Sequence, residues 1–181
     1  TRFEDLVATI ALFRPGPMEN IPEYINAKEK PSEIRYIVPE LKPIVESTYG
    51  IMICQEHIMQ VAQKLAGFSL AKADLLRKAM SKKNANELTK LEQAFIQGCV
   101  KNNYPETIAK EIYNLIFKFA NYGFNKSHSV AYAMISYQMA YLKANHPDYF
   151  FVALLNSVIG SEGKTFEYLQ EAKNHNVGIL G

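Results

Sequence analysis

The sequence is poor in the residues that usually build metal and catalytic sites. It has two cysteines, Cys54 and Cys99, without Cys-x-x-Cys spacing, and its four histidines are scattered. We therefore predict that both cysteines are reduced and buried in an intracellular protein. The aspartates Asp5, Asp74 and Asp148 lie far apart. Because two-metal phosphoryl transfer needs clustered carboxylates, this chain offers no such site.

Other functional signals are missing as well. The chain has no glycine-rich phosphate loop, no Gly-x-Ser-x-Gly elbow and no Cys–His nucleophile pair. Its longest apolar run, Tyr149 to Leu155, is far too short to cross a bilayer, and no signal peptide is visible. The net charge is +2, so any contact with nucleic acid must come from local clusters of cations. These absences predict a chain that binds and positions, with no catalytic residue and no metal ligand.

Apolar residues recur at helical spacing through most of the chain, and no strand pattern is present. The predicted helices span residues 3–13, 49–65, 70–80, 87–101, 108–119, a long stretch after 125, 148–158 and 165–173. Prolines recur through residues 19–43, where we expect an ordered loop with one short helix at 21–26 and a short extended piece near 36–38. A turn of helix at 41–46 is expected to follow. The predicted fold class is all-α, an irregular multi-helix domain with an early proline-rich extended arm.

The most informative stretch is the polar segment Asn125-Lys126-Ser127-His128-Ser129. Gly123 should lie just past a helix end with φ > 0, and Asn125 or Ser127 should cap the next helix. The free N–H groups and the dipole at such a helix start suit a phosphate, with Lys126 and His128 as further donors. An ordinary helix cap without a ligand is the alternative interpretation.

A second cationic cluster lies within residues 76–83, which contain four cations and no acid. Its members are Arg77, Lys78, Lys82 and Lys83. Such a cluster can bind a triphosphate or a nucleic-acid backbone, because each neutralised phosphate releases counterions. A solvated helix face is the alternative.

Aromatic side chains on the long helix are further candidates. Tyr132, near the polar segment, could stack on a base or pack within the fold, and the two interpretations are even. Tyr137 and Tyr141 are four residues apart and share a helix face, and we interpret them as core residues. His57 is adjacent to Glu56 rather than facing it, and we interpret it as a surface residue.

Four motifs together resemble a known family. They are ALFRPGPM at 11–18, STYGIMICQEHIMQVAQ at 47–63, ADLLRKAMSKK at 73–83 and FANYGFNKSHSVAYAMISYQMAYLKANHP at 119–147. In this order and spacing they resemble the fingers region of the alpha subunit of bacterial DNA polymerase III, a C-family replicative polymerase. The similarity runs along nearly the whole chain. Cys54, His57 and Ser81 depart from the residues usual in the family, and Ser81 makes the path of the following loop less certain.

The resemblance implies an all-α fingers domain over residues 1–160 and the truncated start of the next helical segment at 161–181. The palm, exonuclease or PHP, and C-terminal domains would be absent from this chain, which begins at Thr1 as a piece of a longer protein would. The parent protein would be a DNA-directed DNA polymerase with its aspartates and Mg²⁺ in the palm. The fragment alone would be inactive and would hold no cofactor.

The resemblance also implies roles for individual residues. The residues expected to bind the incoming nucleotide's triphosphate are Arg77, Lys78, Lys82, Lys83, Asn125, Lys126, His128 and Ser129. Tyr132 would lie against the nascent base pair, and Arg14 near the palm junction. Expected partners are primer–template DNA, the incoming dNTP, the other domains of the polymerase and, through regions not present here, replisome proteins. A cytoplasmic location without a membrane is expected. The alternative is a helical nucleic-acid-binding or protein-interaction module without nucleotide chemistry.

Overall fold

The computed structural model describes residues 2–82, 85–120 and 123–179. Within them the protein is all-α, as predicted, with ten α-helices, four short 3₁₀ turns and no β-strand. The chain divides into two compact units, residues 1–130 and 131–181. The end of the fingers domain expected at residue 160 stays a prediction.

The first unit contains seven helices and the start of an eighth. They are α1 (Phe3–Leu12), α2 (Ile21–Glu29), α3 (Lys42–Val45), α4 (Gln55–Ala66), α5 (Leu70–Lys82), α6 (Ala85–Lys101), α7 (Glu106–Ala120) and the first residues of α8 (Lys126–Asn145). The second unit contains the rest of α8 with α9 (Pro147–Ser157) and α10 (Glu162–Asn174).

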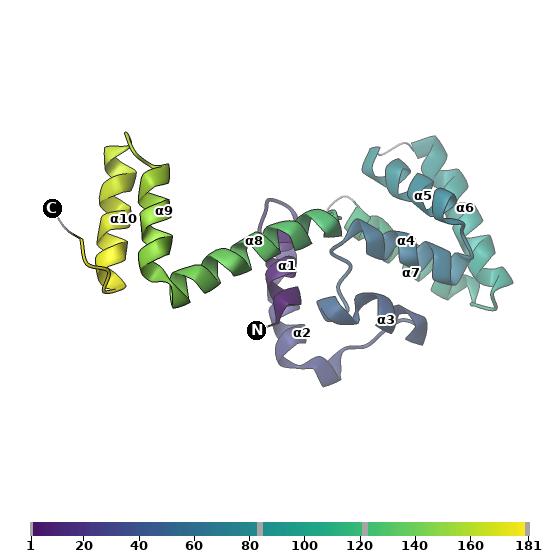
Figure 1. Ribbon diagram of the computed structural model, residues 1–181. Coiled ribbons are helices and arrows are strands. Elements are labelled where there is room, and N and C mark those ends of the chain that lie inside the picture. The colour runs from purple at the N-terminus through teal and green to yellow at the C-terminus, as the bar shows by residue number, and fades with distance from the viewer. Residues whose placement is uncertain (1, 83–84, 121–122, 180–181) are drawn as a thin grey trace. The chain divides into compact units, whose positions relative to one another are not determined.

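The main core of the first unit lies among α4, α5, α6 and α7 (Figure 1). Leu65 of α4, Leu76 of α5 and Phe95 of α6 are all fully buried there. The close approach of α6 to α4 depends on Gly98, since a Cβ at this position would lie 2.2 Å from the carbonyl oxygen of Ala66. Only glycine fits at such a contact.

The helix predicted at 49–65 begins later than expected, at Gln55. Tyr49 and Gly50 have φ of 53° and 88°, a left-handed turn that stops the preceding 3₁₀ turn and delays the helix. The residues before α4 pair with a distant segment instead, because Cys54 forms an isolated parallel bridge with Phe124. Tertiary pairing has therefore overridden the local helical pattern.

The proline-rich arm contains the expected helices and further helical turns. The short helix predicted at 21–26 extends to Glu29, several 3₁₀ turns follow it, and α3 confirms the turn of helix predicted at 41–46. The extended piece predicted at residues 36–38 is instead irregular.

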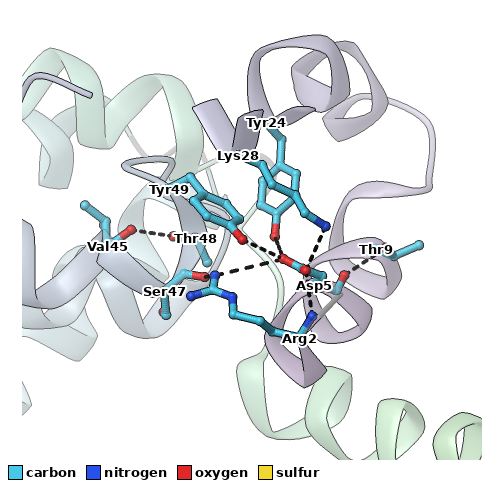
Figure 2. A network of polar contacts seen from close by, with 9 residues as sticks. All are labelled: Arg2, Asp5, Thr9, Tyr24, Lys28, Val45, Ser47, Thr48 and Tyr49. Carbon is cyan, nitrogen blue, oxygen red and sulfur yellow. Dashed lines mark hydrogen bonds and ion pairs between the residues drawn. The ribbon is translucent and has the colours of Figure 1, made fainter. Parts of the chain in front are cut away.

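One buried carboxylate joins this arm to α1 (Figure 2). Asp5 is 5% exposed and accepts hydrogen bonds from Tyr24 (3.0 Å), Lys28 (2.8 Å), Tyr49 (3.1 Å) and the backbone N–H of Arg2 (2.9 Å). Burial alone would raise the pKa of Asp5, but these donors outweigh it and hold the pKa well below its usual range. We call these five residues the Asp5 network.

The second unit is held by α9 packed against α10. Phe151 of α9 and Ala172 of α10 are buried, and Lys143 of α8 forms an ion pair with Glu171 of α10. The prediction that Tyr137 and Tyr141 are core residues is wrong, since both are more than half exposed. Their shared face is not one that this unit buries.

Candidate functional site

Three of the sequence motifs meet at Gln55, the first residue of α4. The backbone N–H of Gln55 donates to the carbonyl oxygen of Phe124 at 3.0 Å. The side-chain oxygen of Gln55 accepts a hydrogen bond from Nη1 of Arg77 on α5 at 3.2 Å. Arg77 and the segment that leads into α8 are therefore brought to one place. We call this place the motif junction and define it as Arg14, Gln55, Glu56, Arg77 and residues 123–129.

The motif at 11–18 also reaches the junction. The guanidinium carbon of Arg14 lies 4.6 Å from the centroid of the Phe124 ring, a cation–π geometry. Nε of Arg14 donates to the carbonyl oxygen of Ala11 at 2.9 Å, and burial lowers the pKa of Arg14. The edge of His128 packs on the same Phe124 ring, with centroids 5.3 Å apart. Phe124 therefore contacts Arg14, from a distant part of the sequence, and His128, four residues further along the chain.

The polar segment does open a helix, and Asn125 is its N-cap. The side-chain oxygen of Asn125 accepts the backbone N–H of His128 at 2.8 Å, which confirms one of the two predicted caps. Asn125, Lys126 and His128 are all exposed.

A carboxylate of the chain itself already lies at this helix start. The two oxygens of Glu56 accept the backbone N–H of Lys126 at 3.1 and 3.0 Å, and one of them also accepts the side-chain amide of Asn125 at 3.2 Å. This is the favourable place for an anion on a helix. A phosphate bound to that N–H would have to displace Glu56, so the side chains of Lys126 and His128 are the more accessible donors.

The positive φ expected at Gly123 stays a prediction, because that angle also involves Tyr122, which lies outside the described residues. The structure shows a requirement for space at this glycine, since a Cβ there would lie 3.2 Å from Cγ of Gln55. The glycine lets the segment before α8 approach α4 closely.

An acid lies on α5 just before the cationic cluster. Asp74 pairs with Arg77 at 2.7 Å and with Lys78 at 2.7 Å, spacings of three and four residues on one helix. Hydrogen bonds from Lys78 and then Arg77 lower the pKa of Asp74. The structure places Arg77 at the junction and leaves Lys78 exposed on α5. Lys83 and the side chain of Lys82 lie outside the described residues.

Two buried polar side chains belong to the helices that meet at the junction. His57 is 1% exposed and Ser129 is fully buried, and neither side chain has a hydrogen-bond partner among the described residues. Burial, with a smaller effect of Lys126, lowers the pKa of His57 to about 4. The prediction of a surface His57 is wrong. Its spacing from Val61 and Leu65 on the apolar stripe was the signal that could have shown this.

Comparison with known proteins identifies the family. The model of the bacterial DNA polymerase III alpha subunit finger domain matches residues 1–103. The DNA polymerase III subunit alpha of Halalkalibacterium halodurans is 53% identical over 178 residues, which cover 98% of this chain. The same subunit of Staphylococcus aureus strain Mu50 is 50% identical over 98% of the chain. The chain belongs to the bacterial DNA polymerase III alpha subunit finger domain family. The resemblance seen in the four motifs is confirmed.

The finger-domain chain spans only a small part of these relatives. It covers 16% of the Halalkalibacterium halodurans subunit and 17% of the Staphylococcus aureus subunit. The family model ends at residue 103, so the α8 segment lies beyond it but within the stretch aligned with both subunits.

The described residues of this finger domain do not suit the metal ions of a polymerase. They include no group of three or more His, Cys, Asp or Glu side chains placed to hold a metal. Asp5 is enclosed by its donors, and Asp74 is paired with two cations of its own helix.

Two further predictions concern parts outside the junction. Tyr132 is exposed and belongs to the second unit, so its contact with a nascent base pair stays a prediction. None of the helices in the described ranges combines the length and apolar character that a bilayer crossing requires.

Proposed function

We propose that this chain is the fingers region of a bacterial replicative DNA polymerase. In that enzyme it binds the triphosphate of the incoming dNTP and covers the nascent base pair during template-directed DNA synthesis. Primer–template DNA and the other polymerase domains are its partners. Catalytic aspartates and Mg²⁺ belong to the palm, and the chain works in the cytoplasm.

The observation that carries this proposal is the motif junction. Arg77 and the α8 segment with Lys126 come from sequence-distant motifs, yet both are attached to the first turn of α4. Cations fixed in advance stabilise the charge that develops on a leaving pyrophosphate, because little reorganisation is needed during the reaction. The residues proposed for the triphosphate are Arg77, Lys78, Lys82, Lys83, Asn125, Lys126, His128 and Ser129, with Tyr132 against the base pair.

Ser129 stands apart within this set, because it is fully buried. Its role would require that the first turn of α8 rearrange when nucleotide binds. Closure of lids and loops around a substrate is common among enzymes that select their substrates by induced fit.

The test is single-turnover nucleotide incorporation by the full-length alpha subunit that contains this sequence. Arg77→Ala and Lys126→Ala should each lower the efficiency of incorporation about tenfold or more. Lys110→Ala is the matched control, because Lys110, like Arg77, is a helical cation paired with an acid of its own helix, but it lies on α7.

Unchanged kinetics in both variants would overturn the proposal. A loss of DNA affinity with steep salt dependence, and no change in the response to dNTP, would instead indicate a nucleic-acid-binding module without nucleotide chemistry.

A further inference from the structure

Gln55 is held from three sides at the motif junction. Its backbone N–H bonds Phe124, its side-chain oxygen accepts from Arg77, and Gly123 packs directly against its side chain. One residue therefore connects α5 with the segment that leads into α8. None of the expectations drawn from the sequence gave Gln55 a role.

The guanidinium of Arg77 has attachments on two different helices. Nε and Nη2 donate to one oxygen of Asp74, three residues earlier on α5, at 2.9 and 2.7 Å. Nη1 donates to Gln55 on α4 at 3.2 Å. Because the guanidinium is planar and its donors point in fixed directions, attachments at both edges set its plane. Asp74 alone would fix Arg77 only relative to its own helix.

We propose that Gln55 is a positioning residue that aims Arg77 at the nucleotide triphosphate. This inference rests on the proposed function, because it needs Arg77 to contact phosphate. Gln55 sets the direction of the guanidinium relative to the α8 segment, so that Arg77 and Lys126 bind the same triphosphate. Gln55 itself touches no reacting atom.

The amide of Gln55 suits this task because it is neutral. An amide oxygen orients a guanidinium without cancelling its charge, whereas a carboxylate would neutralise it. Asp74 already supplies one carboxylate to Arg77. A second carboxylate at position 55 would compete with the phosphates for the same cation. Gln55→Glu should therefore hold Arg77 more firmly and yet weaken nucleotide binding.

The experiment uses the full-length alpha subunit that contains this sequence, with the apparent Kd for dNTP measured by single-turnover incorporation. Gln55→Met keeps the size of the side chain and the backbone contact with Phe124 but removes the acceptor for Arg77. We expect its apparent Kd for dNTP to rise about fivefold, with unchanged affinity for primer–template DNA. Gln55→Glu should raise the apparent Kd without lowering the thermal unfolding temperature.

Gln63→Met is the matched control. Gln63 is a half-buried glutamine of the same helix that lines a different groove with Pro43 and Gln60. It should leave the apparent Kd unchanged. If Gln55→Met fails to fold, Gln55→Glu decides, because a purely structural role predicts normal nucleotide binding for a variant of normal stability.

A double-mutant cycle with Arg77→Ala separates the possible outcomes. If Gln55 acts through Arg77, Gln55→Met has no further effect in the Arg77→Ala background. Additive effects, or a weakened Arg77→Ala enzyme beside a normal Gln55→Met enzyme, would overturn the inference and leave the proposed function standing. If Arg77→Ala binds dNTP normally, the role of Arg77 in the proposed function fails and the inference fails with it.

Discussion

Asp5 and Glu56 are carboxylates of the first unit that each tie distant segments together, and they do so in opposite environments. Asp5 is buried and receives four donors (Figure 2), whereas Glu56 lies partly exposed at the start of α8 and receives backbone and amide N–H groups. In the Asp5 network the buried carboxylate is fully satisfied. Beside Glu56, the buried side chains of His57 and Ser129 have no hydrogen-bond partner within the described part of the chain.

The difference indicates which carboxylate keeps its hydrogen bonds and which can exchange them for other partners. A buried charge with complete hydrogen bonding is lost only at high cost, because each donor would be left without its partner. An exposed carboxylate at a helix start can give way to another anion at smaller cost, because water and the new anion replace its bonds. We interpret the Asp5 network as a structural anchor and the motif junction as the adaptable region.

The largest expected effect is a loss of stability when the Asp5 network is disrupted. Asp5→Asn removes the charge that Lys28 pairs with and replaces one acceptor oxygen by a donor facing tyrosine hydroxyls. We expect the free energy of unfolding to fall by about 3 kcal/mol, measured by urea denaturation. Glu4→Gln, an exposed neighbour in the same turn, is the control and should change little. A loss below about 1 kcal/mol for Asp5→Asn would show that the network is not an anchor.

The next expected effect is on the pH dependence of stability, which differs between His57 beside the motif junction and Asp5 in its network. His57 has a pKa of about 4 when folded, against 6.5 for an ordinary histidine. The unfolded chain therefore binds a proton at higher pH than the folded one, and the contribution of neutral His57 is complete above pH 6.5 and lost as the pH falls toward 4. The full loss is about 3 kcal/mol. Asp5, with a depressed pKa, loses its contribution only below its ordinary value of 3.8.

Urea denaturation across this pH range checks the prediction. His57→Leu keeps an apolar side chain of similar size in the core, and it should flatten the fall in stability between pH 6.5 and 4. Asp5→Asn should leave that fall intact. An equally steep fall in His57→Leu would show that another group is responsible.

Much of the helical architecture could be predicted from local patterns. The apolar stripe of α4, the glycine that ends it and the Asn125 cap all follow from spacing and capping chemistry, and all are present. Local patterns failed where distant segments pair. Residues 49–54 read as helix but form a left-handed turn and a bridge to Phe124.

The candidate site was predicted as two separate cationic clusters, and the sequence could not show what joins them. Gln55 and Glu56 looked like ordinary polar residues inside the helix predicted at 49–65, because their partners lie far away in the chain. Gly123 was expected to serve a helix end, and its close approach to Gln55 is a second requirement that the sequence pattern could not show. Spacing identifies residue types suited to phosphate, whereas positioning contacts emerge only from the tertiary arrangement.

The smallest expected effect tests the adaptable region. Glu56→Gln keeps the size of the side chain but leaves one acceptor oxygen and no charge for the first turn of α8. We expect a loss of about 1 kcal/mol in the free energy of unfolding. Glu23→Gln, an exposed acid in the first turn of α2, is the control and should change less.

Salt sharpens the contrast between the two carboxylates. At about 1 M salt the screening length falls to about 3 Å, so exposed charges interact weakly while buried pairs are little affected. The effect of Glu56→Gln should shrink under these conditions, and that of Asp5→Asn should persist. Equal sensitivity of the two variants to salt would mean that Glu56 is held as firmly as Asp5. A phosphate could then not displace Glu56 at modest cost, and nucleotide contacts at the start of α8 would be limited to side chains.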